Sequence, residues 1–246
     1  MKREDEGMPF LLRYENVAWY EDGKVRILDR RVFPREKRFV ICTDYHEVIK
    51  AIQDMVTQSA GPFTAVGMGM ALAAYQCKDM PEEEQVEFLT KAADELGNAR
   101  PTTANRYSAI THRALDKQLK ALQAGKSAVE AAFNDTIDSL NRRYATEQKI
   151  GDNFVSLLSN NSSILTHCYA ETVIGCIIRA AKKQNKTLKA YDTATEPFFQ
   201  GAKLTASCFQ EGGFETTMVP DNMVNFVLER GDIDVFTTAA DSVTMD

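Results

Sequence analysis

The second half of the chain alternates short apolar segments of strand character with amphipathic segments of helical character. From residue 163 the order is strand, helix, strand, helix, strand, helix and strand, at residues 163–166, 170–184, 187–192, 202–211, 214–219, 222–230 and 233–238. Crossovers of this length are typical of a parallel sheet with helices on its faces. The pattern therefore predicts an α/β fold for this half, and it leaves the spatial order of the strands open.

The first half of the chain predicts a different architecture. Between residues 11 and 41, short extended runs are separated by turn residues, and Asp22-Gly23 lies between two alternating runs. An Asp-Gly pair in that position is a strong signal for a β-hairpin. We therefore expect a small β meander, which Trp19 packs onto the segments that follow.

Helices follow the meander, with a glycine-rich stretch among them. Helices are predicted to begin near Thr43 and Pro81 and to span about 104–123 and 127–150. The stretch QSAGPFTAVGMGMALAA is expected to form a turn whose small residues let either a packed helix or a ligand approach. The sequence predicts a helical domain over residues 1–150, with the meander, and a sheet domain over residues 151–246.

Composition and charge exclude several classes of protein. The formal net charge of -6 disfavours a general nucleic-acid surface, which needs a basic field. The sequence contains no run of eighteen apolar residues, so it predicts no membrane span. The first residues lack the apolar run of a secretory signal. Five cysteines without paired spacing suit a reducing cytoplasm, and no Cys-x-x-Cys or His-x-x-x-His pair indicates a metal site.

Cys168 stands at the junction between the strand at 163–166 and the following helix. Ligands of open α/β sheets bind at the carboxyl ends of strands, and a helix amino terminus lowers a thiol pKa. We therefore expect Cys168 to be partly ionised. A buried cysteine with no chemical role is the alternative. His167 is adjacent, but neighbouring residues of a strand point to opposite faces, which disfavours a cysteine–histidine dyad.

Two other strands lead to polar residues at the same predicted edge. The strand at 187–192 leads to Gln200, and the strand at 233–238 leads to Asp241. A thiol and a carboxylate that meet there would form an acid–base pair. Gln200 could instead bind its own loop, and Asp241 could cap a helix. Asp221 is predicted to be a helix N-cap.

Arg100 precedes Pro101 between two predicted helices. It could face an anion held at the helix terminus. A surface cation near the end of the preceding helix is an equally good interpretation.

Four segments of the sequence together resemble a known superfamily. They are SILTHCYAETVIGCIIRAA, TATEPFFQGAKLTA, ARPTTANRYSAI and VPDNMVNFVLERGDIDVFTTAADSVTMD. The chain resembles methylthioribose-1-phosphate isomerases, ribose-1,5-bisphosphate isomerases and the regulatory subunits of initiation factor 2B. The resemblance implies an N-terminal meander and helical domain, a C-terminal Rossmann-like domain, a cytoplasmic homodimer and a reaction without a cofactor.

The resemblance also implies residue roles and a reaction. Cys168 and Asp241 fall on catalytic positions, Arg100 and Gln200 on substrate-binding positions, and Ser59, Ala60 and Gly61 on a phosphate-binding element. The implied reaction is the conversion of a 5-substituted ribose 1-phosphate of the methylthioribose type into the ribulose 1-phosphate. The alternative is a regulatory protein that senses a nucleotide or sugar phosphate without turnover.

The sequence departs from the pattern of the isomerases at several places. Gln58 occupies the position of an arginine that usually precedes the phosphate-binding element, and Glu196 replaces an arginine in the loop before Gln200. Members of the superfamily also continue beyond the position of Asp246 with a further phosphate-binding element. We therefore expect the chain to be a fragment whose sheet is completed by further residues.

Overall fold

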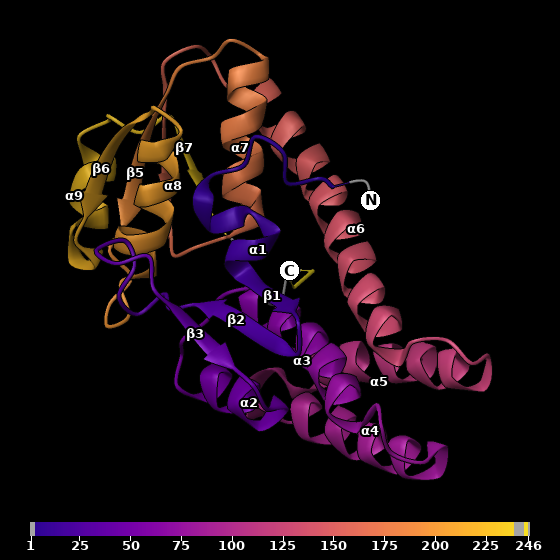
Figure 1. The fold of residues 1–246 in the computed structure, drawn as a ribbon. Helices are drawn as coiled ribbons and strands as arrows, with labels where there is room; N and C mark the ends of the chain where they lie inside the picture. The colour runs from indigo at the N-terminus through magenta and orange to yellow at the C-terminus, as the bar shows by residue number, and fades with distance from the viewer. Residues whose placement is uncertain (1–2, 239–243, 246) are drawn as a thin grey trace. The chain divides into compact units, whose positions relative to one another are not determined.

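A computed structural model of the chain describes residues 3–238 and 244–245 (Figure 1). These residues form two compact units. Unit 1 contains Tyr14–Arg143 together with Arg3 and Glu4, and unit 2 contains Asp5–Arg13 together with the described part of Tyr144–Asp246. The boundary between Arg143 of unit 1 and Tyr144 of unit 2 falls inside helix α6 (Ala128–Ser156). The boundary that the sequence predicts after residue 150 falls inside the same helix.

Unit 1 opens with the expected β meander. Strands β1 (Ala18–Glu21), β2 (Lys24–Leu28) and β3 (Phe39–Cys42) form an antiparallel sheet in the order β1-β2-β3. Asp22 and Gly23 connect β1 to β2 with φ angles of 46° and 74°. A two-residue hairpin turn with positive φ at both positions favours Asp-Gly, so the predicted hairpin is confirmed.

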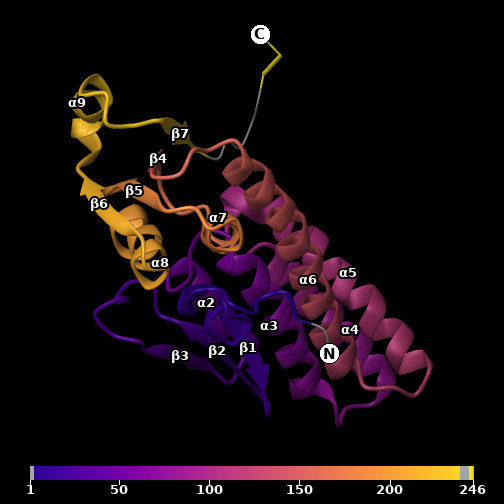
Figure 2. The ribbon, with the colours of Figure 1, turned by 90° about the horizontal axis from the view of Figure 1, so that it is seen from above.

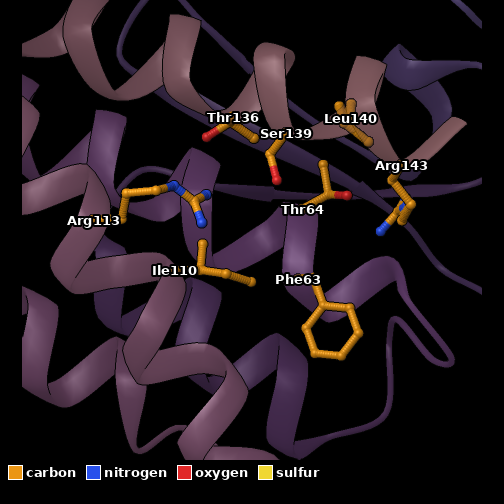
Figure 3. Close-up of a pocket in the computed structure, with 8 residues that line it drawn as sticks. All are labelled: Phe63, Thr64, Ile110, Arg113, Thr136, Ser139, Leu140 and Arg143. Atoms are coloured by element: carbon orange, nitrogen blue, oxygen red, sulfur yellow. The ribbon is translucent and has the colours of Figure 1, made fainter. Parts of the chain in front are cut away.

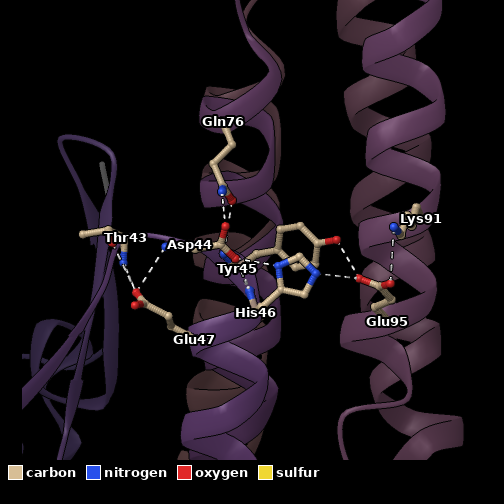
Figure 4. Close-up of polar contacts among 8 residues, drawn as sticks. All are labelled: Thr43, Asp44, Tyr45, His46, Glu47, Gln76, Lys91 and Glu95. Carbon is tan, nitrogen blue, oxygen red and sulfur yellow. Dashed lines mark hydrogen bonds and ion pairs between the residues drawn. The ribbon is translucent and has the colours of Figure 1, made fainter.

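The helix after the meander begins with a capping box, shown in Figure 4. The Asp44 carboxylate accepts a hydrogen bond of 2.7 Å from the His46 backbone amide, and the Glu47 carboxylate accepts one of 3.3 Å from the Asp44 amide. These bonds satisfy backbone donors that the first turn leaves without a helical partner. Helix α2 (Tyr45–Gln53) therefore begins next to the predicted start at Thr43.

The glycine-rich stretch predicted as a turn is mostly a helix, α3 (Gly61–Cys77), and that part of the prediction is wrong. Helix α3 is buried almost all round and contacts β1, β2, α2, α4 and α5. A Cβ atom at Gly67 would lie 2.5 Å from Thr136 Oγ1, and one at Gly69 would lie 3.0 Å from Leu96 Cδ2. The glycines of α3 therefore serve close helix packing, the alternative that the sequence left open.

Three more helices complete unit 1 with the first part of α6. They are α1 (Tyr14–Val17), α4 (Glu82–Gly97) and α5 (Ala104–Gln123). Helix α4 begins directly after Pro81, and Glu82, Glu83 and Glu84 stand in its first turn. Acidic residues there interact favourably with the helix dipole, which explains the confirmed start.

Substituting Gly67 by alanine is expected to destabilise unit 1 by about 1–3 kcal/mol, because the added methyl group overlaps Thr136 in a closely packed contact. Chemical unfolding monitored by circular dichroism measures this change. Adding Thr136→Ala to the same chain should recover part of the loss. Equal unfolding midpoints for the wild type and Gly67→Ala would contradict the packing role.

Unit 2 contains the expected parallel sheet. Its strands are β4 (Ser162–Thr166), β5 (Leu188–Thr193), β6 (Glu215–Val219) and β7 (Val235–Thr237), in the order β6-β5-β4-β7. Helices α7 (Thr172–Lys183), α8 (Ala206–Glu211) and α9 (Val224–Glu229) connect them, and α7 and α8 lie on the same side of the sheet (Figure 2). The order of the strands reverses between β4 and β7, which defines the switch point of the sheet.

A short segment from the start of the chain is part of the core of unit 2. Met8 and Leu12 are buried, and a Cβ atom at Gly175 would lie 2.4 Å from Leu12 Cδ1 and 2.6 Å from Met8 Sδ. The Tyr144 hydroxyl donates a hydrogen bond of 2.7 Å to the Leu12 carbonyl. Residues 5–13 are thus fixed to this unit by apolar packing and by a buried hydrogen bond.

Within the part of the chain that the structure describes, no helix is long and apolar enough to cross a membrane.

Candidate active site

Cys168 lies in the short loop between β4 and α7, at the switch point of the sheet. Its φ angle is 63°, a left-handed conformation that costs free energy in a residue other than glycine. Its backbone amide donates a hydrogen bond of 3.1 Å to Thr195 Oγ1, and its carbonyl accepts one of 2.6 Å from Thr205 Oγ1. The backbone of the candidate nucleophile is therefore held by residues from the next crossover.

The environment of Cys168 raises the pKa of its thiol, and the expected lowering is wrong. Burial raises this pKa, a backbone hydrogen bond from Tyr169 lowers it, and the nearby charge of Asp221 raises it. Helix α7 begins only at Thr172, so the thiol does not stand in the first turn of the helix. Cys168 is consequently protonated at neutral pH.

His167 binds a threonine of the neighbouring strand. Its Nδ1 atom lies 2.8 Å from Thr193 Oγ1, which in turn lies 3.3 Å from Thr195 Oγ1. Two hydroxyl groups at the end of β5 therefore connect the imidazole to the residue that holds Cys168. This arrangement agrees with the sequence argument against a cysteine–histidine dyad.

Asp221 follows β6 and fixes the loop after β5. Its carboxylate accepts hydrogen bonds of 2.8 Å from the Thr195 amide and 2.7 Å from the Glu196 amide. The bond from Glu196 is the main cause of a lowered pKa of Asp221. The predicted helix N-cap is wrong, because Pro220 precedes the short 3-10 turn and Asp221 is its first residue.

Gln200 stands directly before a π-helical turn, Gly201–Thr205. Its Oε1 atom is buried and accepts no hydrogen bond from the residues that the structure describes. A Cβ atom at Gly201 would lie 1.8 Å from the Thr193 carbonyl oxygen, so only glycine permits this turn to approach β5. The loop thus presents an open acceptor close to the carboxyl end of β5, and π-helical turns are frequent at functional sites.

Asp192 is a buried carboxyl group that the sequence analysis missed. It is fully buried in β5, next to Thr166 of β4, and neither carboxyl oxygen has a hydrogen-bond partner among the described residues. Burial raises the pKa of Asp192 to about 8. The only signal in the sequence is one acidic residue in an otherwise apolar strand end. Perturbed carboxyl groups of this kind are enriched at functional sites.

The pKa of Asp192 makes the stability of the protein depend on pH. The folded chain keeps this group protonated up to about pH 8, whereas the unfolded chain ionises it near the ordinary aspartate pKa of 3.8. Stability is therefore lost as the pH rises from about 4 to about 8. Asp192→Asn should be more stable than the wild type by several kcal/mol at pH 8 and nearly equal at pH 4, measured by urea unfolding. A stability difference that is the same at both pH values would refute this.

The candidate residues of unit 1 surround the start of α3. Ser59 is exposed with a φ angle of 57°, Ala60 is the N-cap, and Gly61 is the first helical residue. Arg100 is half-buried, and its Nη2 atom lies 2.7 Å from the sulfur of Met55, in the segment that leads to Ser59. Arg100 thus lies near the loop that precedes α3.

The structure groups the predicted site residues into two sets. Cys168 and Gln200 belong to unit 2, whereas Arg100 and residues 59–61 belong to unit 1. Asp241 lies outside the described residues. Thr237, the last residue of β7, pairs with Thr166 of β4, two residues before Cys168. Among the described residues, no group of three or more His, Cys, Asp or Glu side chains could hold a metal ion.

A small cavity in unit 1 lies next to the start of α3 (Figure 3). Two of the residues that line it, Phe63 and Arg143, donate hydrogen bonds to the Ala60 carbonyl. Its volume of about 20 Å³ accommodates no more than a water molecule. It lies between α3, α5 and α6, and Arg113 at its side binds the buried Asp135 at 3.0 Å. This cavity is too small for a sugar phosphate.

Comparison with known proteins identifies the class to which this fold and site belong. Residues 58–246 match the model of the initiation factor 2 subunit family, and the chain belongs to that family. The match covers the start of α3, the Cys168 loop and the segment of Asp241. The recognition of the superfamily from sequence and the predicted α/β fold class are thereby confirmed.

Relatives with similar sequences include proteins named methylthioribose-1-phosphate isomerase. The chain is 29% identical over 243 residues to the methylthioribose-1-phosphate isomerase of Fervidobacterium nodosum and covers 68% of its length. The corresponding protein of Syntrophotalea carbinolica is 31% identical, with 67% of its length covered. The chain therefore spans about two thirds of these relatives.

Two solved structures share the fold over most of this chain. The crystal structure of 5-methylthioribose 1-phosphate isomerase from Pyrococcus horikoshii superposes with a TM-score of 0.75 at 25% identity, covering 93% of this chain and 66% of the other. The structure named translation initiation factor eIF-2B, subunit delta, from A. fulgidus has a TM-score of 0.76 at 27% identity, covering 94% and 69%. The chain is about equally similar to a structure named as an isomerase and to one named as an initiation factor, so the activity has to be argued from the site.

Proposed function

We propose that this chain belongs to an aldose–ketose isomerase that converts a 5-substituted ribose 1-phosphate of the methylthioribose type into the ribulose 1-phosphate. The observation that carries the proposal is Cys168, held in a left-handed conformation at the switch point between β4 and β7. The names of the relatives support the same reaction. The complete enzyme is proposed to be a cytoplasmic homodimer that acts in methionine salvage or a related pathway.

The chemistry of the substrate explains why an acid and a thiol are needed. A phosphate on the anomeric oxygen blocks spontaneous ring opening, so the ring oxygen must be protonated while its bond to C1 breaks. Hydrogen must then move from C2 to C1. We assign the first step to Asp241 as general acid and the second to Cys168, which takes the C2 proton as thiolate.

The remaining residues are proposed to hold the substrate. The backbone of Ser59, Ala60 and Gly61 at the amino terminus of α3 would bind the phosphate, because the helix dipole favours an anion there. Arg100 would add a positive charge near that loop. Gln200 would accept a hydrogen bond from a sugar hydroxyl through its unpartnered Oε1 atom.

The reaction itself is tested with the complete protein. Methylthioribose 1-phosphate, 5-deoxyribose 1-phosphate and ribose 1,5-bisphosphate are supplied in turn, and ketose formation is followed by NMR. Turnover of one substrate supports the isomerase. Tight binding without turnover would instead favour a sensor of sugar phosphates or nucleotides, a function that the departures at Gln58 and Glu196 also suit.

The role of Cys168 predicts a loss of rate and a change in the pH profile. Burial raises the pKa of the thiol, so the thiolate fraction, and with it kcat/KM, should increase with pH above neutrality. Cys168→Ser should lower kcat at least about 100-fold and abolish this increase. Cys176→Ala, a control in α7, should retain the activity of the wild type.

Solvent isotope labelling separates this route from its rival. Proton transfer through Cys168 should introduce deuterium at C1 of the product in D2O. An unlabelled product together with a flat pH profile would show a direct hydride shift, in which the thiol only shapes the site.

A further inference from the structure

Arg30 is a buried arginine that lies behind the proposed phosphate-binding loop. It follows β2 and is 0% exposed, the largest fully buried side chain among the described residues. Its backbone amide donates a hydrogen bond of 2.9 Å to the Val56 carbonyl, and its Nη1 atom donates one to the Gln58 carbonyl. Burial of a guanidinium is costly, so an arginine at such a position needs a reason.

The guanidinium of Arg30 packs directly against the first residue of α3. A Cβ atom at Gly61 would lie 3.0 Å from Arg30 Nη1 and 3.1 Å from Arg30 Cζ. The positive charge of Arg30 therefore lies beside the amino terminus of this helix of seventeen residues, where it adds to the positive end of the helix dipole. An anion at that terminus would interact favourably with both.

Two polar side chains of the same loop have unsatisfied atoms. Thr57 is 0% exposed and Gln58 is 2% exposed, yet Thr57 Oγ1 and Gln58 Oε1 have no hydrogen-bond partner within the described part of the chain. Buried polar atoms of this kind normally have partners, so each unsatisfied one needs an explanation such as a missing ligand or water. The loop thus combines a buried charge with the Thr57 hydroxyl, which can donate to a phosphate oxygen, and with Gln58 Oε1, which can accept a hydrogen bond from a bound water.

We propose that Arg30 replaces, from a different position in the chain, the positive charge that position 58 lacks. The superfamily pattern predicts an arginine at residue 58, where this chain has glutamine. Arg30 reaches the backbone of the same residue from the end of β2. Arg30 is then a positioning residue: it holds the loop through the Gln58 carbonyl and contributes its charge to phosphate binding. The inference rests on the proposed phosphate site and requires no turnover.

The test measures binding of inorganic phosphate and of methylthioribose 1-phosphate to the complete protein by calorimetry. Arg30→Gln should weaken both by about tenfold, the loss expected for a charge-assisted interaction with phosphate. Arg30→Lys should recover part of the affinity because it keeps the charge. The exchange variant Arg30→Gln/Gln58→Arg should restore affinity to within about threefold, because it returns the charge to the same loop.

Arg35→Gln is the matched control, since it removes an exposed arginine from the same connection between β2 and β3. Its phosphate affinity should equal that of the wild type. If the enzyme turns over, Arg30→Gln should raise KM and leave kcat nearly unchanged. If it does not turn over but phosphate binding follows the pattern above, the proposed isomerase fails and the role of Arg30 stands.

Two results would overturn the inference. The first is a folded Arg30→Gln protein that binds phosphate as tightly as the wild type, and the second is a wild type that does not bind phosphate. If Arg30→Gln does not fold, Gln58→Glu provides the second variant, because a carboxylate in the loop opposes the charge of Arg30. Unchanged phosphate affinity in Gln58→Glu would then overturn the inference.

Discussion

Thr195 connects the loops that follow three neighbouring strands, and the geometry around Cys168 depends on it. Its hydroxyl accepts a hydrogen bond from the Cys168 amide after β4, and its own amide donates to Asp221 after β6. Because β4, β5 and β6 run parallel, their carboxyl ends meet at one edge, and a single residue can join all three. The left-handed conformations of Cys168 and Thr195 are maintained by these bonds.

The start of α3 is organised by different means. Here a buried guanidinium, a glycine that leaves space for it and a helix terminus lie together, and the Gln58 carbonyl accepts a hydrogen bond from the guanidinium. Position 58 illustrates why the loss of one charged residue from a motif does not by itself show that the binding site has lost its charge. A missing charge in the motif can be supplied by a residue nearly thirty positions away, provided that the fold brings it to the same loop.

Local patterns predicted most of the fold, and long-range packing explains the errors. The hairpin at Asp22-Gly23 and the parallel sheet depend on turn chemistry and periodicity, which a sequence shows directly. The helix α3 was missed because glycine has a low helix propensity, and only burial on all sides outweighs it. Cys168, Gln200 and Asp241 were predicted from strand ends, and Ser59, Ala60 and Gly61 from the family resemblance. The contacts of Asp221 and the burial of Asp192 arise between segments that no local pattern relates.

The burial of residues 5–13 in unit 2 has a consequence for the biosynthesis of the chain. Met8 and Leu12 pack against Gly175, and the Phe10 amide binds the Glu211 carboxylate. When the ribosome has synthesised only the residues of unit 1, residues 5–13 have emerged but the parts of unit 2 that cover them have not yet been made. Met8 and Leu12 therefore remain accessible to chaperones until α7 and α8 have been synthesised. Unit 2 can complete its folding only when its two segments, which Tyr14–Arg143 separates in the sequence, come together.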